Sequence, residues 1–284
     1  MAKKIISSPN DSYIVGKCET PHEPGEREAD EAKSTGDKAL NLTVLKATTI
    51  LRIISNADHG KSLTDIVAET GFPTTVCHRM LATLESERLV DRQKESGRYR
   101  LGLGLVSLAH KALHKHPIGL HAEHLLIEVA RMMDDVALLM VPYGTEALCV
   151  DRKDNNSQII SMGTQIGSRQ PLHCGGGPFA ILAFSSDAFI NDYLTRELEK
   201  RTAKTVTDPG KIRTRIQEAR QRGYTVGDED LFDHVVAVGV PLYDKDNLLI
   251  GSGSLSGVKP RYNSEKIAEA AKCLLSFATK MSSV

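Results

Sequence analysis

The sequence predicts an α+β protein, with a winged helix-turn-helix in its N-terminal part and helices packed on a mostly antiparallel sheet in its C-terminal part. Three helical patterns followed by a strand-like hairpin occur between residues 44 and 101. From Val136 onward, short apolar runs separated by Gly, Asn and Thr are typical of strands. The length of 284 residues is enough for about two domains.

The composition is that of a soluble globular protein, with 40% hydrophobic and 25% charged residues. The 36 Lys and Arg residues balance 36 Asp and Glu residues, which excludes a wholly basic or wholly acidic protein but not a local basic patch. No uncharged apolar run reaches the roughly 20 residues that span a bilayer, and no signal-peptide pattern is present. The five cysteines are odd in number and form no CxxC motif. We therefore expect reduced thiols and a cytoplasmic protein that does not contact a membrane.

Residues 1–42 are expected to form a disordered tail. They are rich in Lys, Glu, Asp, Pro, Ser and Gly, and their few apolar residues show no period. Such a segment cannot bury enough apolar surface to offset the entropy lost on ordering. An arm that folds when it binds a partner is the alternative.

Three helices are predicted after this tail. Apolar residues at helical spacing mark the first over residues 44–54, and turn residues at 56–60 end it. The second begins at Ser62 or the next residue, and Gly-Phe-Pro at 71–73 breaks it, because Gly suits a left-handed turn and Pro restricts the residue before it. The third helix is predicted over residues 74–87.

A hairpin is predicted after the third helix. Leu89-Val90 starts one strand, and residues 99–101 alternate as the returning strand. Helices followed by a hairpin in this order make a winged helix-turn-helix, which we assign to residues 43–102. A linker helix is expected over residues 103–116, just before Pro117, which ends or kinks it.

Residues 117–284 are expected to form the second domain, with helices packed on a mostly antiparallel sheet. The expected strands cover residues 136–143, 146–152, 157–163, 234–244 and 248–257. The expected helices cover residues 120–133, a helix entered from the Gly-rich segment at 176–184, and residues 187–199, 208–222 and 263–281. Asp208-Pro209 and Gly223 are start and stop signals of one of these helices.

The third helix is the candidate recognition helix for DNA. In a helix-turn-helix, the turn directs the N-terminal residues of the second helix of the motif into the major groove. Thr74 and Thr75 lie at this N-terminus, where hydroxyl and free N–H groups can hold a phosphate. His78 and Arg79 point outward from the first turns and can reach base edges or phosphates.

The hairpin turn adds a local positive charge. Residues 88–100 contain five basic and two acidic residues, a net charge of +3. Arg92, Lys94 and Arg98 are therefore candidate contacts to the DNA backbone or minor groove. A winged helix that serves protein contacts only is the alternative, and the outward Arg79 together with the basic turn favours DNA.

Five segments in order resemble the IclR (isocitrate lyase regulator) family of bacterial transcription factors. The segments are TDIVAETGFPTTVCHRMLATLESERLVDRQKESGRYRLGLGLVSL, QPLHCGGGPFAILAF, GYTVGDED, VAVGVPLYD and GSLSG. The resemblance covers about residues 43 to 280. It implies a repressor or activator of a catabolic operon that binds palindromic operator DNA as a homodimer, which can pair again into a tetramer.

The resemblance also implies a GAF-like effector-binding domain for a small carboxylate or aromatic acid. On the residues alone, the glycine loop before residue 178 is either a tight connection or a place where N–H groups and a helix N-terminus bind an anion. The resemblance favours the second interpretation and places these residues at the effector pocket: Gly176 and Gly177 on the loop, Ile159 and Met162 on an apolar wall, and Val235, Ala237, Ser254 and Ser256 on two late strands.

Three positions depart from the family pattern. The family often has Cys where this chain has Ala237, and Asp where it has Gly227. Asp228 is adjacent and is expected to take the role of the missing carboxylate. The usual Gly-Lys after the loop is Pro178-Phe179 here. Since these changes remove polarity or size, we expect an effector larger or more apolar than a small oxoacid.

Neither a metal centre nor a catalytic site is predicted, and no cofactor is expected. Two histidine pairs have a spacing that places both rings on one helix face: His110 with His114, and His121 with His124. No full ligand set is adjacent to them, so a metal sensor is a less favoured alternative. His173-Cys174 lacks the Gly-x-Ser-x-Gly elbow of a hydrolase, and an enzyme regulated by its N-terminal domain is the least favoured alternative.

Overall fold

The computed structural model describes residues 40–115, 118, 121–154 and 163–282. Two predicted segments fall outside this part of the chain except at its border: the tail over residues 1–42 and the strand over 157–163. The candidate residues Ile159 and Met162 also lie outside it. The described residues divide into two compact units, one of which ends at Lys115. The predicted α+β fold class is confirmed.

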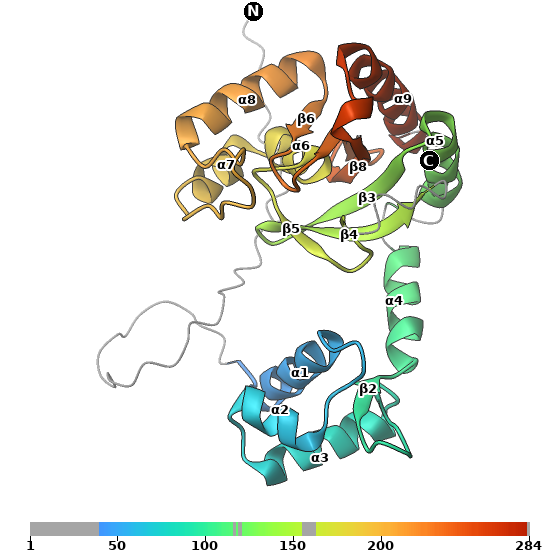
Figure 1. The fold of residues 1–284 in the computed structure, drawn as a ribbon, viewed down its shortest axis with the longest axis vertical. Coiled ribbons are helices and arrows are strands. Elements are labelled where there is room, and N and C mark those ends of the chain that lie inside the picture. Colours follow the sequence, from blue (N-terminus) through green and yellow to red (C-terminus); the bar gives the residue numbers. More distant parts are fainter. Residues whose placement is uncertain (1–39, 116–117, 119–120, 155–162, 283–284) are drawn as a thin grey trace, which may run out of the picture. The chain divides into compact units, whose positions relative to one another are not determined.

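The N-terminal unit contains three helices, a hairpin and a further helix (Figure 1). Its elements are α1 (Leu42–Ser55), α2 (Leu63–Thr70), α3 (Thr74–Ser86), β1 (Val90–Arg92), β2 (Tyr99–Leu101) and α4 (Gly104–Lys115). Helix α1 begins two residues before the periodic pattern, because the Asn41 side chain accepts hydrogen bonds from the N–H groups of Thr43 and Val44.

Local capping signals set the ends of α2. The Ser62 side chain accepts a hydrogen bond from the Asp65 N–H, and the Asp65 side chain accepts one from the Ser62 N–H. This capping box satisfies two N–H groups that the helix leaves free. At the other end Gly71 has a φ of 67°, the left-handed conformation expected for it. The helix-turn-helix therefore follows from signals within a few residues of each turn.

One apolar core holds this unit together. It is formed by Ile50, Ile54, Ile66, Cys77, Leu81, Leu84, Val90 and Tyr99. The three helices and both strands all contribute to it, as their apolar periodicity predicts. The hairpin is joined to the segment before α2 by a β-bridge between Lys61 and Tyr99.

The C-terminal unit is a six-stranded sheet with helices on both faces (Figure 1). Its helices are α5 (His121–Met133), α6 (Gly176–Phe184), α7 (Asp187–Tyr193), α8 (Pro209–Arg222) and α9 (Ser264–Ser282), and its strands are β3 (Val136–Tyr143), β4 (Glu146–Lys153), β5 (Arg169–Pro171), β6 (Thr225–Asp228), β7 (Val235–Tyr243) and β8 (Leu249–Val258). The strand order is β5-β4-β3-β8-β7-β6, and every neighbouring pair is antiparallel.

Two apolar layers lie on opposite faces of this sheet. Helices α5 and α9 pack on the face that carries Leu139, Val238 and Leu255. Helices α6, α7 and α8 pack on the face that carries Leu138 and Met140. Because side chains alternate along a strand, Leu138 and Leu139 enter different cores. The pocket described below lies on the face covered by α6.

Three elements differ from the sequence prediction. Strands β5 and β6 were not expected, and both are short strands at the two edges of the sheet. Helix α7 ends at Tyr193, although the pattern predicts a helix to residue 199. Its continuation is replaced by a segment whose Glu199 carbonyl accepts a hydrogen bond from the buried His173 ring, 2.9 Å away.

Candidate functional site

The exposed face of α3 carries the four residues predicted to contact DNA. Thr74, Thr75, His78 and Arg79 are exposed, whereas Cys77 on the opposite face is buried. The residue before the helix is a proline, which makes no side-chain capping bond. The first N–H groups of α3 thus have no side-chain cap. This arrangement is suited to a phosphate oxygen.

The hairpin brings together only part of the predicted basic set. Arg92 and Lys94 are exposed near the turn. Arg98 is half-buried, because its Nη1 donates to the Gly60 carbonyl at 3.0 Å and lies 3.5 Å from an Asp65 carboxylate oxygen. Arg98 therefore fastens the hairpin to the start of α2, and its charge is partly balanced.

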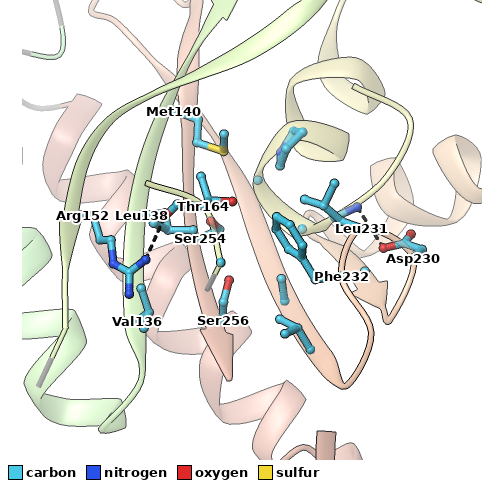
Figure 2. Close-up of a pocket in the computed structure, with 18 residues that line it drawn as sticks. Val136, Leu138, Met140, Arg152, Thr164, Asp230, Leu231, Phe232, Ser254 and Ser256 are labelled. Carbon is cyan, nitrogen blue, oxygen red and sulfur yellow. Dashed lines mark hydrogen bonds between the residues drawn. The ribbon is translucent and has the colours of Figure 1, made fainter. Parts of the chain in front are cut away.

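A pocket lies between the sheet, the N-terminus of α6 and the segment between β6 and β7 (Figure 2). About 500 Å³ of space lies among its lining residues, a figure that includes open solvent. The residues that line it are Val136, Leu138, Met140, Arg152, Gly163, Thr164, Gly175, Gly176, Gly177, Pro178, Gly227, Asp230, Leu231, Phe232, Val235, Ala237, Ser254 and Ser256. Six of the predicted effector residues are among them.

Glycines allow the N-terminus of α6 to approach the sheet closely. A Cβ on Gly176 would lie 2.8 Å from the Ala237 backbone, and one on Gly239 would lie 2.3 Å from the Gly176 carbonyl oxygen. Gly175 precedes the helix with a φ of 75°, which L side chains rarely adopt. The N–H groups of Gly176 and Gly177 are in the first helical turn and have no intrahelical acceptor. They are available to an anion in the pocket.

Three serines of β8 face α6, because side chains alternate along the strand. Ser252 donates a hydrogen bond to the Gly177 carbonyl at 2.8 Å. Ser254 is 1% exposed, and its Oγ has no hydrogen-bond partner among the described residues. Ser256 lines the pocket one step further along, whereas Leu255 enters the opposite core. A buried hydroxyl without a partner is costly, so a ligand oxygen at Ser254 would remove that cost.

A buried ion pair holds the glycine loop in place. One carboxylate oxygen of Asp230 accepts a hydrogen bond from the Gly175 N–H at 2.9 Å, and the other accepts one from Arg215 at 2.8 Å. The Arg215 guanidinium also lies 4.5 Å from the centre of the Phe179 ring. Asp230 therefore positions the loop. Because Arg215 neutralises its charge, Asp230 repels an anion in the pocket less than an unpaired carboxylate would.

His173 and Cys174 make no catalytic pair. The Glu199 carbonyl can only accept, so His173 Nε2 donates to it and Nδ1 accepts from the Tyr193 hydroxyl at 2.8 Å. Burial raises the pKa of the Cys174 thiol to about 12, so the thiol stays protonated near neutral pH. Both side chains have structural roles.

No group of three or more His, Cys, Asp or Glu residues in the described part of the chain could hold a metal ion. None of the described helices combines the length and apolar character needed to cross a bilayer.

Two family models match the chain. The model of the IclR helix-turn-helix domain matches residues 43–94, and that of the bacterial transcriptional regulator IclR C-terminal domain matches residues 110–283. The chain belongs to the IclR family. It is therefore a bacterial-type transcriptional regulator with a DNA-binding and an effector-binding domain, and the comparisons indicate no enzymatic family.

Other IclR-family proteins resemble the chain over most of their length. The HTH-type transcriptional regulator KipR of Bacillus subtilis is 30% identical over 230 residues, which cover 80% of this chain and 90% of KipR. The glycerol operon regulatory protein of Streptomyces griseus is 26% identical, over 77% of this chain and 86% of that protein.

Solved structures share the fold. An IclR transcriptional regulator of Alicyclobacillus acidocaldarius aligns with a TM-score of 0.77 and 24% identity, over 86% of this chain and 98% of that one. An IclR homologue of Microbacterium hydrocarbonoxydans, solved with 4-hydroxybenzoate, aligns with a TM-score of 0.73 and 20% identity, over 85% and 98% of the two chains.

The structure of this IclR-family chain places Asp228 outside the residues that line the pocket. Side chains alternate along β6, so Asp228 faces away from the pocket that Gly227 lines, and both its carboxylate oxygens lie 2.6 Å from Lys259 Nζ. A Cβ on Gly227 would lie 2.7 Å from the Asp230 carboxylate. Asp230, not Asp228, is the carboxylate of this pocket.

Arg152 is the second pocket residue that sequence reasoning missed. Ala147 and Cys149 face the core under α6, so simple alternation along β4 puts Asp151 on that face and Arg152 on the other. A bulge in the pairing of β3 with β4, where Leu139 and Met140 pair with Asp151 and Cys149, shifts the register by one residue. Arg152 consequently faces the pocket, and no local pattern signals this.

Proposed function

We propose that the chain is a ligand-responsive repressor or activator that binds operator DNA as a homodimer and is regulated by a small organic acid in the α6 pocket. The observation that carries the proposal is the pocket itself. It brings the N-terminal N–H groups of α6, at Gly176 and Gly177, close to Ser254, whose buried hydroxyl has no hydrogen-bond partner among the described residues. Hydrogen-bond donors at a helix N-terminus favour a carboxylate.

The DNA-binding part of the proposal rests on the exposed face of α3 and the basic hairpin. A fluorescence anisotropy titration with the DNA upstream of neighbouring genes tests it. We expect tighter binding to one palindromic segment than to random DNA of equal length, and a steep loss of affinity with salt. Equal, weak binding to both would support the alternative in which the winged helix serves protein contacts only.

The homodimer is supported by exposed apolar residues at the start of α4 and just before it. Leu103, Val106 and Leu108 are 79%, 61% and 57% exposed, which is unusual for so many large apolar residues in one short segment. Val106→Glu is expected to shift the sedimentation of the protein toward the monomer. Ser107→Glu is the matched control, because Ser107 is exposed on the same helix and gains the same charge. If both variants remain dimers, α4 does not form the dimer contact.

The effector part predicts a link between the pocket and DNA binding. An acid that binds the pocket can change DNA affinity only if it binds better to one arrangement of the dimer. Addition of such an acid is expected to change the anisotropy titration of the parent. The same acid should have a much smaller effect on a Ser254→Ala variant. Identical effects of the acid on the parent and on Ser254→Ala would show that it does not regulate DNA binding through this pocket.

A further inference from the structure

The end of α3 and the start of α4 meet at one crossing of the backbone. The Arg88 carbonyl, two residues beyond the end of α3, accepts a hydrogen bond from the Gly104 N–H at 2.9 Å. The Leu89 carbonyl accepts one from the Gly102 N–H, also at 2.9 Å. Gly102 follows β2 directly, and Gly104 is the first residue of α4. We call these four residues the α3–α4 joint.

Both glycines are needed because the two backbone segments nearly touch. A Cβ on Gly102 would lie 2.3 Å from the Arg88 carbonyl oxygen, and one on Gly104 would lie 2.5 Å from the same atom. A larger residue at either position has to push the segments apart, since glycine alone allows such a close approach. Steric contact therefore prevents a closer approach of α4 to α3, and the two hydrogen bonds oppose their separation.

The backbone of Arg88 adopts an uncommon conformation at this crossing. Its φ is 57°, in the left-handed region, at a position after a helix where glycine is usual. The Arg88 N–H donates to the Glu85 carbonyl at 2.9 Å, and the Leu89 N–H donates to the Leu84 carbonyl at 2.8 Å, as in a Schellman motif. A residue other than glycine keeps this conformation only where its surroundings hold it. The end of α3 is thus fixed in a form that directs the Arg88 carbonyl to α4.

Helix α4 is attached to the N-terminal unit through its first turn. Every residue from Val106 to Leu113 is exposed, whereas Gly102 is buried. In Figure 1, α4 leaves the hairpin where β2 ends. Helix α4 carries apolar residues to which we assign the dimer contact, and α3 carries the predicted DNA contacts. The joint therefore sets the angle between the helix that contacts the second copy and the helix that contacts DNA.

We propose that Gly102 and Gly104 are positioning residues that fix the spacing of the two DNA half-sites bound by the dimer. This inference rests on the proposed function, in which a homodimer binds a palindrome. It adds the structural element that determines how far apart the two copies of α3 can bind.

The size of the expected effect follows from the length of α3. A Cβ on Gly104 would be about 0.9 Å short of an ordinary van der Waals contact. Over the roughly 5 Å radius of a helix, this corresponds to a tilt of about 10°. Helix α3 has 13 residues, so its other end lies about 20 Å away and moves by about 3 Å. This displacement is close to the rise of one base pair, about 3.4 Å.

Selection from a library of random duplex DNA, with the full-length parent and Gly104→Ala, tests the proposal. The parent should enrich two inverted copies of one half-site at a single spacing. Fluorescence anisotropy then measures affinity for duplexes whose spacing is changed by one or two base pairs, and the parent should bind these about tenfold more weakly. Gly104→Ala should enrich the same half-site. Its optimal spacing should be shifted by one or two base pairs, or its preference reduced to less than about threefold.

Ser107→Ala is the matched control. Like Gly104→Ala, it replaces a residue of α4 with the strongest helix former, but Ser107 is exposed and lies outside the joint. Ser107→Ala should therefore keep the spacing preference of the parent. If it shifts the optimum as far as Gly104→Ala does, the effect comes from the helical propensity of α4 and the proposal is wrong.

Hydrogen exchange of the parent gives a second readout, which also serves if Gly104→Ala does not fold. If α3 and α4 move as one body, the N–H groups of Gly102 and Gly104 should exchange within about tenfold of the rate of Leu84 in α3. Mass spectrometry with residue-level fragmentation measures these rates. Faster exchange at the two glycines would show that the joint opens independently of α3, and would overturn the proposal.

The outcomes separate this proposal from the proposed function. If Gly104→Ala loses affinity equally at every spacing, or keeps the optimum of the parent, the glycines only stabilise the fold, and the homodimer on operator DNA stands. If the parent enriches no inverted repeat, the protein does not bind a palindrome as a dimer, and both proposals fail.

Discussion

Arg79 is the residue whose loss tests the DNA-binding surface most directly. It is exposed on α3, and the buried Cys77 and Leu81 hold the opposite face of the helix in the core. Arg79→Ala is therefore expected to weaken operator binding without unfolding the domain. If Arg79 reads a guanine, the cost is roughly 1–3 kcal/mol and specificity is relaxed at that base. If it contacts only phosphate, affinity falls for all sequences and the salt slope decreases by about one.

Anisotropy titrations with operator and random DNA measure this effect. Arg131→Ala is the matched control, because Arg131 is an exposed arginine near the end of α5 in the other unit. Its loss should leave DNA affinity unchanged. If the parent and Arg79→Ala bind operator DNA with equal affinity, and also bind random DNA with equal affinity, Arg79 does not contact DNA.

Ser254 and Ser252 form a second pair of residues for a controlled test. Because the Ser254 hydroxyl is buried without a described partner, Ser254→Ala should leave the free energy of unfolding unchanged or raise it. Ser252→Ala should lower it by about 1 kcal/mol, because it removes the hydrogen bond to Gly177. Urea unfolding measures both. A larger loss for Ser254→Ala than for Ser252→Ala would show that the Ser254 hydroxyl has a structural partner.

At the scale of elements, His173 joins the segment between β5 and α6 to α7. Burial lowers the pKa of His173 from its ordinary value of 6.5. The unfolded chain therefore takes up a proton that the folded protein does not, as pH falls below about 6.5. Stability that depends on neutral His173 is complete above that value and is lost on acidification toward the folded pKa. We expect the melting temperature to fall between about pH 7 and 5.

His173→Gln isolates this effect, because glutamine does not titrate. The variant should be less stable than the parent at neutral pH, since its contacts to Tyr193 and Glu199 are altered. Its melting temperature should depend less on pH over the same range. If the difference in melting temperature between the parent and His173→Gln is the same at every pH, the protonation of His173 is not coupled to folding.

At the scale of the whole molecule, the sequence predicts that residues 1 to about 40 are dispensable for folding. They lack a periodic apolar face, so their deletion should remove little buried surface. A chain beginning at Leu40 retains Asn41, which caps α1. Its melting temperature should lie within about 2 °C of that of the parent, corresponding to less than roughly 1 kcal/mol. A large loss in differential scanning calorimetry would show that the tail packs on the folded part.

The sequence by itself determined the features that depend on near neighbours. Periodicity and capping signals located α1, α2, α3 and α8, with Gly71 and Asp208 at the expected helix ends. Alternation alone placed Ser254 and Ser256 on one face of β8. These features could be read from a few consecutive residues, because helix caps, turns and strand alternation are set by local backbone geometry.

Only the tertiary structure decided which residues meet in the pocket. The short strands β5 and β6 form because each pairs with a longer strand next to it in the sheet, β5 with β4 and β6 with β7. Asp230 replaces Asp228 because β6 turns Asp228 outward, and Arg152 enters the pocket because a bulge in β4 reverses its face. A one-residue change of register sends a side chain to the opposite side of a sheet, and register is set by the pairing of whole strands rather than by the residues next to that side chain.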